Sequence, residues 1–594
     1  MSDFNKISDE FKKYNLLLFD TNELDKYKPS DFTLDVTFSN NFCYPEFSLG
    51  FNYFIHQIKH DTEILNTFNN RKKVYLVTSL FEKSIDYKND SKDIYENSIG
   101  DSTALFIKSI DPNYPPILNR AFLKFWEMIV LFDLIPNDTN FTSSHLAEGP
   151  GSFIQATIIY RDYLKKNKKI SSTKSDNYYG VTLFSDHQYL NMQKDFINYI
   201  DKVKPKQLHI FDNSNVDTIE DMYGGGNEFI NDENYIDYKK LLKTPSNGDI
   251  TKLNTILQFA GGQEKPSDLV TADGGFDWDN ENLQEQEAYK LIIGQMFTAL
   301  KIQNNKGNFV IKIFESYTFV TLRLIEFLRS FYEKVYIYKP FTSRISNSEK
   351  YIICKNFNKK LMTNDISSKL DNIIKRINQN EEYNINDIFT NINLSKEKIN
   401  LYKQINSNLL LKQYIGINNI LEFIALENYN GIEYNAYLQK QIIASLFWNK
   451  LFLNPSNYSK LCKYGTKYTY LKYEFKNNDI FINEYKITKN PKKKTQVVIT
   501  DKEKLQQEKD NDTSQLSKEN KTKQTGGSKN IKSKPKTKSK SKSKSKSKSK
   551  SKNNDSISDE EYKKDKEDEI INMYGGGNDS DLDSDDMIIG TMDD

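Results

Sequence analysis

Residues 111–360 predict a doubly wound α/β fold, that is, a mostly parallel sheet with helices on both faces. Apolar runs of strand length alternate with runs of helix length along this stretch. The strand runs, such as FVIKIF and DLVTAD, are rich in apolar and β-branched residues, as is typical of strands covered on both faces. The turns EGPGS, GDIT and ADGG fall at strand ends, where ligands bind in sheets of this kind.

The elements follow one another in a regular order. A helix is expected over 117–131, a strand over 141–147 and, after the EGPGS turn, a helix over 153–164. A polar insertion at about 213–247 then interrupts the series before GDIT and obscures the third strand. The other expected elements are strands at 178–183, 206–211, 268–273, 308–314, 334–339 and 350–357, and helices at 188–200, directly after GDIT, at 283–300 and at 321–332.

Three segments lie outside this core. Residues 1–110 mix short amphipathic and aromatic runs, which predicts an N-terminal α/β extension. Residues 365–490 are expected to form a mainly helical domain for packing or partner docking. Residues 491–594 are expected to be a disordered tail, first Lys/Ser-rich and then acidic. Its basic half (491–552) has 21 Lys against 6 acidic residues, and its acidic half (553–594) has 3 Lys against 15.

The charge and the cysteine pattern exclude several classes of protein. Without the tail, 59 of the 83 basic and 60 of the 81 acidic residues remain, so nucleic-acid binding by the core would need a local basic groove. The three Cys form no CxxC pair and the five His no HExxH motif, so no metal site is expected. The start lacks the layout of a signal peptide and no run of about 18 apolar residues occurs. A soluble intracellular protein is therefore expected, in the cytoplasm or the nucleus.

The segment LAEGPGSF (146–153) predicts a ligand-binding turn. Gly149 and Gly151 permit a tight turn and a close approach of the backbone to a ligand, and Glu148 is expected to stay ionised at the strand end. Many nucleotide-binding folds use such a turn, so alone it indicates little. Asp249, in NGDIT, stands at a second strand end, where its carboxylate could accept a hydrogen bond from an adenine amino group.

Four charged residues point to catalysis when they are taken together. Lys312 lies inside the apolar strand FVIKIF, where an amine is costly to bury without a partner. Asp273 follows another strand, Glu349 precedes the last strand, and Lys124 lies on the helix before the first strand. A structural salt bridge explains each one singly. Their occurrence in this order within one α/β unit favours a catalytic site.

These motifs identify a family resemblance. LAEGPGSF, NRAFLK, ADGGFDWDNENLQEQE and KPFTSRISNSEKYIICK are similar to segments of the FtsJ (RrmJ)-type ribose 2′-O-methyltransferases, most of all the adrift-type cap-specific mRNA 2′-O-methyltransferases. The resemblance covers about 115–357. It implies a Rossmann-like class I methyltransferase fold with a seven-stranded sheet, and S-adenosylmethionine as the cofactor.

The resemblance also implies roles for individual residues. Lys124, Asp273, Lys312 and Glu349 match the family's Lys-Asp-Lys-Glu catalytic set. The implied cofactor-binding residues are Ala147, Glu148, Gly149, Pro150, Gly151, Ser152 and Phe153, with Asp249 and Ile250 on the adenine side. The implied RNA-binding residues are Asn119, Asn282, Leu283, Gln284 and Asn347. The Ala-Glu-Gly that precedes Pro150 is a mild departure from the family's usual residues.

The chemistry fits these residues independently of the family. Methyl transfer from a sulfonium to a ribose 2′-hydroxyl needs a base and no metal, and a Lys held neutral can serve. Lys312 is the candidate base, favoured in its neutral form by Lys124 and oriented by Asp273 and Glu349. Phe276 and Trp278 could stack on an RNA base or simply pack.

The expected partner is RNA, in particular capped mRNA, together with the capping or transcription machinery. Two other readings stay open. One is methylation of an internal ribose of ribosomal or transfer RNA. The other is a cap- or RNA-binding scaffold subunit.

Overall fold

The structure is a computed structural model. It describes residues 16–22, 24–43, 45, 49–62, 64, 74, 79–82, 99–136, 140–167, 176–184, 191–211, 236–275, 281–425 and 432–453. The tail predicted at 491–594, the aromatic pair Phe276 and Trp278, and most of the insertion at 213–247 lie outside these residues. The domain boundaries expected from the sequence stay predictions.

The centre of the fold is an eight-stranded sheet with the order β1-β8-β9-β7-β6-β3-β4-β5. The pairs among β5, β4, β3, β6 and β7 are parallel, whereas β9 runs antiparallel to β7 and β8. The strands are β1 (Leu17–Asp20), β3 (Thr142–Leu146), β4 (Asn177–Val181), β5 (Leu208–Ile210), β6 (Ser267–Ala272), β7 (Gln303–Ile313), β8 (Tyr332–Lys339) and β9 (Lys350–Phe357).

The strand order confirms the predicted class. Numbered within the seven strands β3 to β9, it reads 3-2-1-4-5-7-6, the doubly wound order with an antiparallel strand inserted near one edge. The predicted count of seven strands was wrong by one. The eighth strand, β1, comes from the N-terminal segment and pairs antiparallel with β8, Leu17 opposite Lys339. A four-residue edge strand more than 300 positions away along the chain carries no local signal that would assign it to this sheet.

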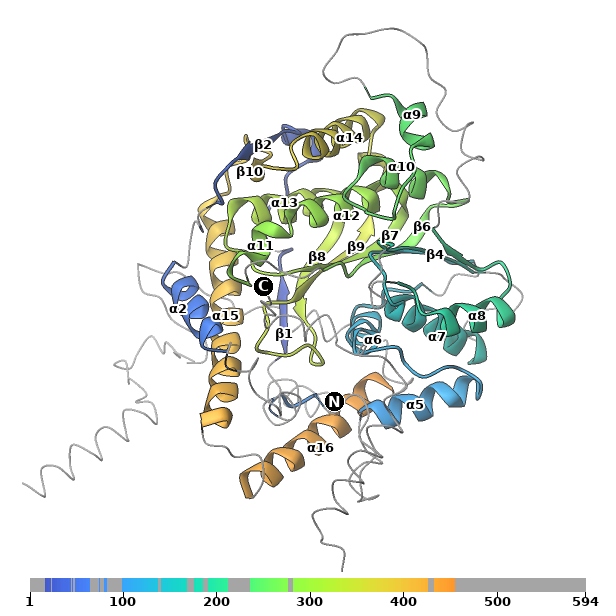
Figure 1. Ribbon diagram of the computed structural model, residues 1–594, viewed down its shortest axis with the longest axis vertical. Coiled ribbons are helices and arrows are strands. Elements are labelled where there is room, and N and C mark those ends of the chain that lie inside the picture. The colour runs from blue at the N-terminus through green and yellow to red at the C-terminus, as the bar shows by residue number, and fades with distance from the viewer. Residues whose placement is uncertain are drawn as a thin grey trace, which may run out of the picture. The chain divides into compact units, whose positions relative to one another are not determined.

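Two layers of helices cover the sheet (Figure 1). On one face, α10, α12, α13 and α14 pack with side chains such as Val270 and Ile311, and on the other α6, α7 and α8 pack with their strand neighbours Leu269 and Val310. This alternation follows the period of two along a strand. The helices are α6 (Ala121–Phe132), α7 (Ser152–Lys166), α8 (Lys194–Val203), α9 (Tyr238–Lys243), α10 (Leu253–Gly261), α11 (Gln284–Glu287), α12 (Tyr289–Ile302), α13 (Phe319–Phe331) and α14 (Asn364–Gln379), with 3₁₀ turns at Glu281–Leu283 and Lys359–Leu361.

Some boundaries differ from the prediction. The helix predicted at 117–131 begins only at Ala121, because 117–120 form an extended lead-in and a turn. The single helix predicted at 283–300 is a 3₁₀ turn followed by α11 and α12. The last strand has the bounds that were predicted, 350–357. The third strand, obscured in the sequence by the insertion, is β5, which pairs parallel with β4.

The segments flanking the core also contain regular elements. After residue 380 a strand precedes two long helices: β10 (Asn384–Ile388), α15 (Lys396–Ala425) and α16 (Ile432–Phe452). The range expected to be mainly helical therefore also contains a strand, and β10 pairs antiparallel with β2. The described N-terminal elements besides β1 are a 3₁₀ turn at Pro29–Asp31, β2 (Val36–Ser39), α2 (Leu49–Asp61) and α5 (Ile99–Ile110). None of the helices in the described ranges is long and apolar enough to cross a membrane.

Candidate active site

The four residues predicted to be catalytic lie in one connected network. Lys124, on α6, donates to Glu349 just before β9, with 3.1 Å between Nζ and Oε2. Lys312, in β7, lies 3.4 Å from Asp273, measured from Nζ to Oδ1, directly after β6. Tyr351, in β9, joins the two pairs. Its hydroxyl lies 2.9 Å from Asp273 Oδ1 and 3.3 Å from Glu349 Oε1.

Tyr351 and Ser343 are members of this network that sequence reasoning missed. Ser343 Oγ donates to Glu349 Oε1 over 3.0 Å. Tyr351 is two residues after Glu349, so strand periodicity puts both side chains on the same side of β9, and this spacing was the available signal. A buried Tyr more often serves packing, and the sequence alone does not reveal which carboxylate its hydroxyl meets.

The network is almost closed to solvent. Lys124 and Glu349 are 2% exposed and Lys312 is 3% exposed. Lys312 Nζ also lies 5.7 Å from the centre of the Phe314 ring. Gly275 leaves room for this amine, since a Cβ at that position would lie 3.3 Å from Nζ. Buried amines held against carboxylates are costly, and such groups concentrate at functional sites.

The turn between β3 and α7 brings the backbone of 147–153 to the same end of the sheet. Ala147 has a φ of 53° and Gly151 a φ of 117°, both in the left-handed region that such a tight turn requires. Ser152 Oγ donates to Asn119 Oδ1 over 2.8 Å. The Phe153 side chain instead packs in the core, stacked on Phe125 at 4.3 Å between ring centres.

Glu148 differs from the expectation that it stays ionised. Burial raises its pKa to about 8 and the nearby Asp273 carboxylate adds to the rise, although backbone N–H donors oppose it. Those donors are Phe153 and Ile154 at the first turn of α7, 2.7 and 2.9 Å from Oε1. His145 Nδ1 lies 3.9 Å from Oε2 but supplies no charge, because burial lowers the pKa of this ring to about 3. The balance of these effects leaves the pKa of the Glu148 carboxyl well above its ordinary value of 4.5.

Asp249 and Ile250 occupy the turn before α10. Asp249 Oδ1 accepts from Thr251 N and Oγ1 over 2.9 and 2.8 Å. Ile250 is 3% exposed. The turn lies against the end of β4, since a Cβ on Gly248, whose φ is 82°, would lie only 1.9 Å from the carbonyl oxygen of Thr182.

The five residues predicted to bind RNA lie in two places. Asn119 is half-buried beside the start of α7, and its Oδ1 also accepts from Ala121 N. Gln284 and Asn347 lie near each other, because Ser348 Oγ donates to Gln284 Oε1 over 2.8 Å. Asn282 and Leu283 form the half-buried 3₁₀ turn just before Gln284.

The side chains at this edge fit the predicted cofactor. S-adenosylmethionine carries a cationic sulfonium and an ammonium group, and three carboxyl groups stand at the ends of neighbouring strands or their turns: Glu148, Asp249 and Asp273. The turns at 147 and 274 touch, since a Cβ on Gly274 would lie 3.0 Å from that of Ala147. Within the described ranges, no group of three or more His, Cys, Asp and Glu residues is placed to hold a metal ion.

Comparisons with known proteins agree with this geometry. Residues 117–357 match the family of FtsJ-like methyltransferases. The chain is 35% identical over 147 residues to the cap-specific mRNA (nucleoside-2′-O-)-methyltransferase 1 of Mus musculus, covering 23% of this chain and 17% of that protein. It is 46% identical over 90 residues to the enzyme of the same name from Dictyostelium discoideum, covering 15% of this chain and 12% of that protein. The chain thus spans less than a fifth of the length of these relatives.

Among solved structures, human methyltransferase-like protein 13 aligns with 43% of this chain and 90% of that chain, at 8% identity and a TM-score of 0.20. A TM-score this low carries no argument about the site. The assignment depends on the sequence match, which contains the whole Lys-Asp-Lys-Glu network. Residues 117–357 therefore match the FtsJ-like methyltransferases, and shorter segments of the chain are similar to cap-specific mRNA (nucleoside-2′-O-)-methyltransferases.

Proposed function

We propose that this protein transfers a methyl group from S-adenosylmethionine to the ribose 2′-hydroxyl of a cap-proximal nucleotide in mRNA, with Lys312 as the general base. The observation that carries the proposal is the network in which Tyr351 joins the Lys124–Glu349 and Lys312–Asp273 pairs. It stands at the end of the sheet where a doubly wound fold binds its ligands.

The side chains divide the work of the reaction. S-adenosylmethionine, when bound, supplies a methyl group on a positively charged sulfur. Lys312 Nζ accepts the 2′-hydroxyl proton as the ribose oxygen forms its bond to the methyl carbon and the carbon–sulfur bond breaks. Asp273 orients Lys312 and stabilises the ammonium group that results. Lys124, Glu349 and Tyr351 hold this arrangement rigid, so that the two reactants meet in the required alignment.

The capped substrate is favoured by the relatives. The proteins to which this chain is 35% and 46% identical are both named as cap-specific mRNA (nucleoside-2′-O-)-methyltransferases. The matched segments cover less than a quarter of this chain, so cap dependence is the part of the proposal that most needs a direct test.

One experiment tests both the reaction and its substrate. Methyl transfer from labelled S-adenosylmethionine is measured on one RNA sequence prepared with and without a cap, and nuclease mapping then locates the label. Label on a cap-proximal ribose of the capped RNA alone supports the proposal. Equal labelling of an internal ribose in both RNAs contradicts cap dependence, and absence of transfer with intact RNA binding would favour a scaffold.

A further inference from the structure

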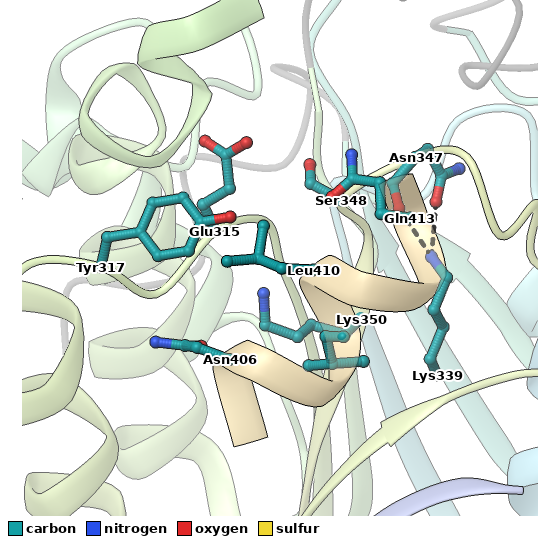
Figure 2. A pocket seen from close by; sticks show the side chains of 10 residues that line it. Glu315, Tyr317, Lys339, Asn347, Ser348, Lys350, Asn406, Leu410 and Gln413 are labelled. Carbon is teal, nitrogen blue, oxygen red and sulfur yellow. Dashed lines mark hydrogen bonds between the residues drawn. The ribbon is translucent and has the colours of Figure 1, made fainter. Parts of the chain in front are cut away.

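A small pocket lies beside the proposed catalytic network, between the sheet edge and α15 (Figure 2). Its cavity volume is about 20 Å³, room for little more than one water-sized group such as a phosphate oxygen, and the pocket is partly open to solvent. The proposed catalytic Glu349 is flanked by two lining residues, Ser348 and Lys350. The described residues that line it are Glu315, Tyr317, Lys339, Asn347, Ser348, Lys350, Asn406, Leu409, Leu410 and Gln413. The last four belong to α15, which lies outside the matched residues 117–357.

Two buried amide donors in the pocket wall have no acceptor among the residues that the structure describes. Gln413 and Asn347 are only 4% and 8% exposed, and neither Gln413 Nε2 nor Asn347 Nδ2 has a hydrogen-bond partner within the described part of the chain. Lys339 Nζ holds Asn347 through its Oδ1, over 2.6 Å, so that the amide nitrogen is left to face another acceptor. Buried amide donors almost always make a hydrogen bond, and a buried donor without one destabilises the fold. The pocket therefore suits a ligand that brings acceptor oxygens.

The charge of the wall is positive. Lys339 and Lys350 line the pocket, although burial lowers the pKa of Lys350 to about 8. Glu315, the one carboxylate among the described lining residues, is paired with Lys59 of α2 at 2.6 Å. Lys350 donates to the carbonyl oxygen of Phe314. An anion with several acceptor oxygens fits this combination of amines and amide donors better than a neutral or cationic group does.

The wall supplied by α15 is firmly held. Asn406 exchanges two hydrogen bonds with Ser316, one to its hydroxyl at 2.7 Å and one to its carbonyl oxygen at 2.6 Å. Leu410 packs in a small core with Tyr317 and with Ile55 of α2. Gln413, one turn beyond Leu410, is therefore presented by a fixed helix, which reduces the entropy lost when it binds a ligand.

We propose that this pocket binds a backbone phosphate of the RNA substrate close to the target ribose, with Gln413 and Asn347 as hydrogen-bond donors. The inference rests on the proposed function, because it takes RNA to be the substrate. It assigns a substrate-binding role to a helix outside the matched methyltransferase domain. A phosphate in the pocket would place the RNA strand beside Glu349. Lys339, which lines the pocket, lies with its Nζ only 2.7 Å from the Glu349 carbonyl oxygen.

The test is the affinity of the full-length protein for a short capped RNA, measured by fluorescence anisotropy. Gln413→Leu removes the donor at similar size and should raise Kd about tenfold. Gln413→Glu should raise Kd further, because it sets a carboxylate against the phosphate. The matched control is Gln404→Leu. Its position, nine residues earlier, lies on the opposite face of α15, and Kd should stay within about twofold of wild type.

A phosphate scan identifies the chemical group. A single neutral methylphosphonate, moved along the RNA, should weaken wild-type binding at one position and have no such effect in the Gln413→Leu variant. Coupling at no position, or an unchanged Kd in both Gln413 variants with normal circular dichroism, overturns the inference. If wild-type protein binds RNA and shows this coupling but transfers no methyl group, the proposed function fails while the phosphate pocket stands. If it binds no RNA, both fail.

Discussion

Helix α6 carries two buried charged residues one turn apart, Lys124 and Glu127, and their surroundings differ sharply. Glu127 is fully buried and accepts from five donors that belong to four residues of the scaffold: Tyr338, Phe341, Thr342 and Trp448. Lys124 instead pairs with Glu349. The Tyr351 hydroxyl then links Glu349 to the Lys312–Asp273 pair.

The comparison shows that buried charge alone does not mark a reactive site. The Glu127 carboxylate offers about four acceptor positions, and five donors saturate them. Burial raises the pKa of Glu127, while hydrogen bonds from Thr342, Trp448 and Tyr338 act against the rise. Such a group ties α6 to β8 and α16 and has no capacity left for a substrate. Lys124 instead connects, through Glu349 and Tyr351, to the ends of the strands, where a doubly wound sheet binds its ligands.

The largest expected effect is on catalysis. Lys312→Ala should lower kcat by about 10²–10⁴-fold, since removal of a general base typically costs that much. Binding of S-adenosylhomocysteine, measured by calorimetry, should persist because the turn at 147–153 is untouched. A turnover number within a few-fold of wild type would show that Lys312 is not the base. The Lys312 network would then be structural, as the Glu127 network is.

The second prediction concerns the saturated network. Glu127→Leu leaves the Trp448 N–H, the Tyr338 hydroxyl and the Thr342 donors without their acceptor, so the free energy of unfolding should fall by about 3–5 kcal/mol. Urea unfolding measures this loss. At a temperature where the variant is folded, its kcat should stay within a few-fold of wild type. Unchanged stability combined with lost turnover would reverse the roles assigned to Lys124 and Glu127.

The third prediction uses the raised pKa of Glu148. Its ordinary value is 4.5 and its folded value about 8, so the folded state holds the proton more tightly. The resulting contribution to stability is complete below about pH 4.5 and is lost as the pH rises through 8, by at most about 1.4 kcal/mol per pH unit. Urea unfolding between pH 5 and 8.5 should show wild type losing stability relative to Glu148→Gln. Parallel curves for the two proteins would contradict the raised pKa.

The smallest expected effect on turnover comes from the tail. Both networks lie within 124–448, so truncation after residue 490 should leave kcat nearly intact. The basic half of the tail, with 21 Lys against 6 acidic residues, should add a salt-dependent component to RNA affinity. Truncation should therefore flatten the salt dependence of RNA binding, and removal of 553–594 alone should strengthen binding at low salt. Identical salt titrations for the three proteins would show that the tail takes no part.

Much of the core could be predicted from the sequence by itself. The alternation of buried strands and helices determined the doubly wound sheet, because strand and helix periods are local properties of the chain. Lys312 in an apolar strand and Asp273 directly after the preceding strand marked the right end of the sheet for the same reason. The Lys-Asp-Lys-Glu set could be named because the motifs that contain its members resemble those of the FtsJ-type methyltransferases.

Other features were decided only by the tertiary structure. Leu17–Asp20 completes the sheet by pairing with Lys339, and Tyr351 joins two ion pairs whose members come from α6, β7 and the ends of β6 and β9. The sequence did not reveal that the pKa of Glu148 would be raised, since this pKa depends on how completely the fold removes water from the carboxyl group. Gln413 gave no signal at all. Gln413 reaches the pocket only because α15 packs beside residues 315–350. Contacts between residues this far apart in the chain leave no local sequence pattern.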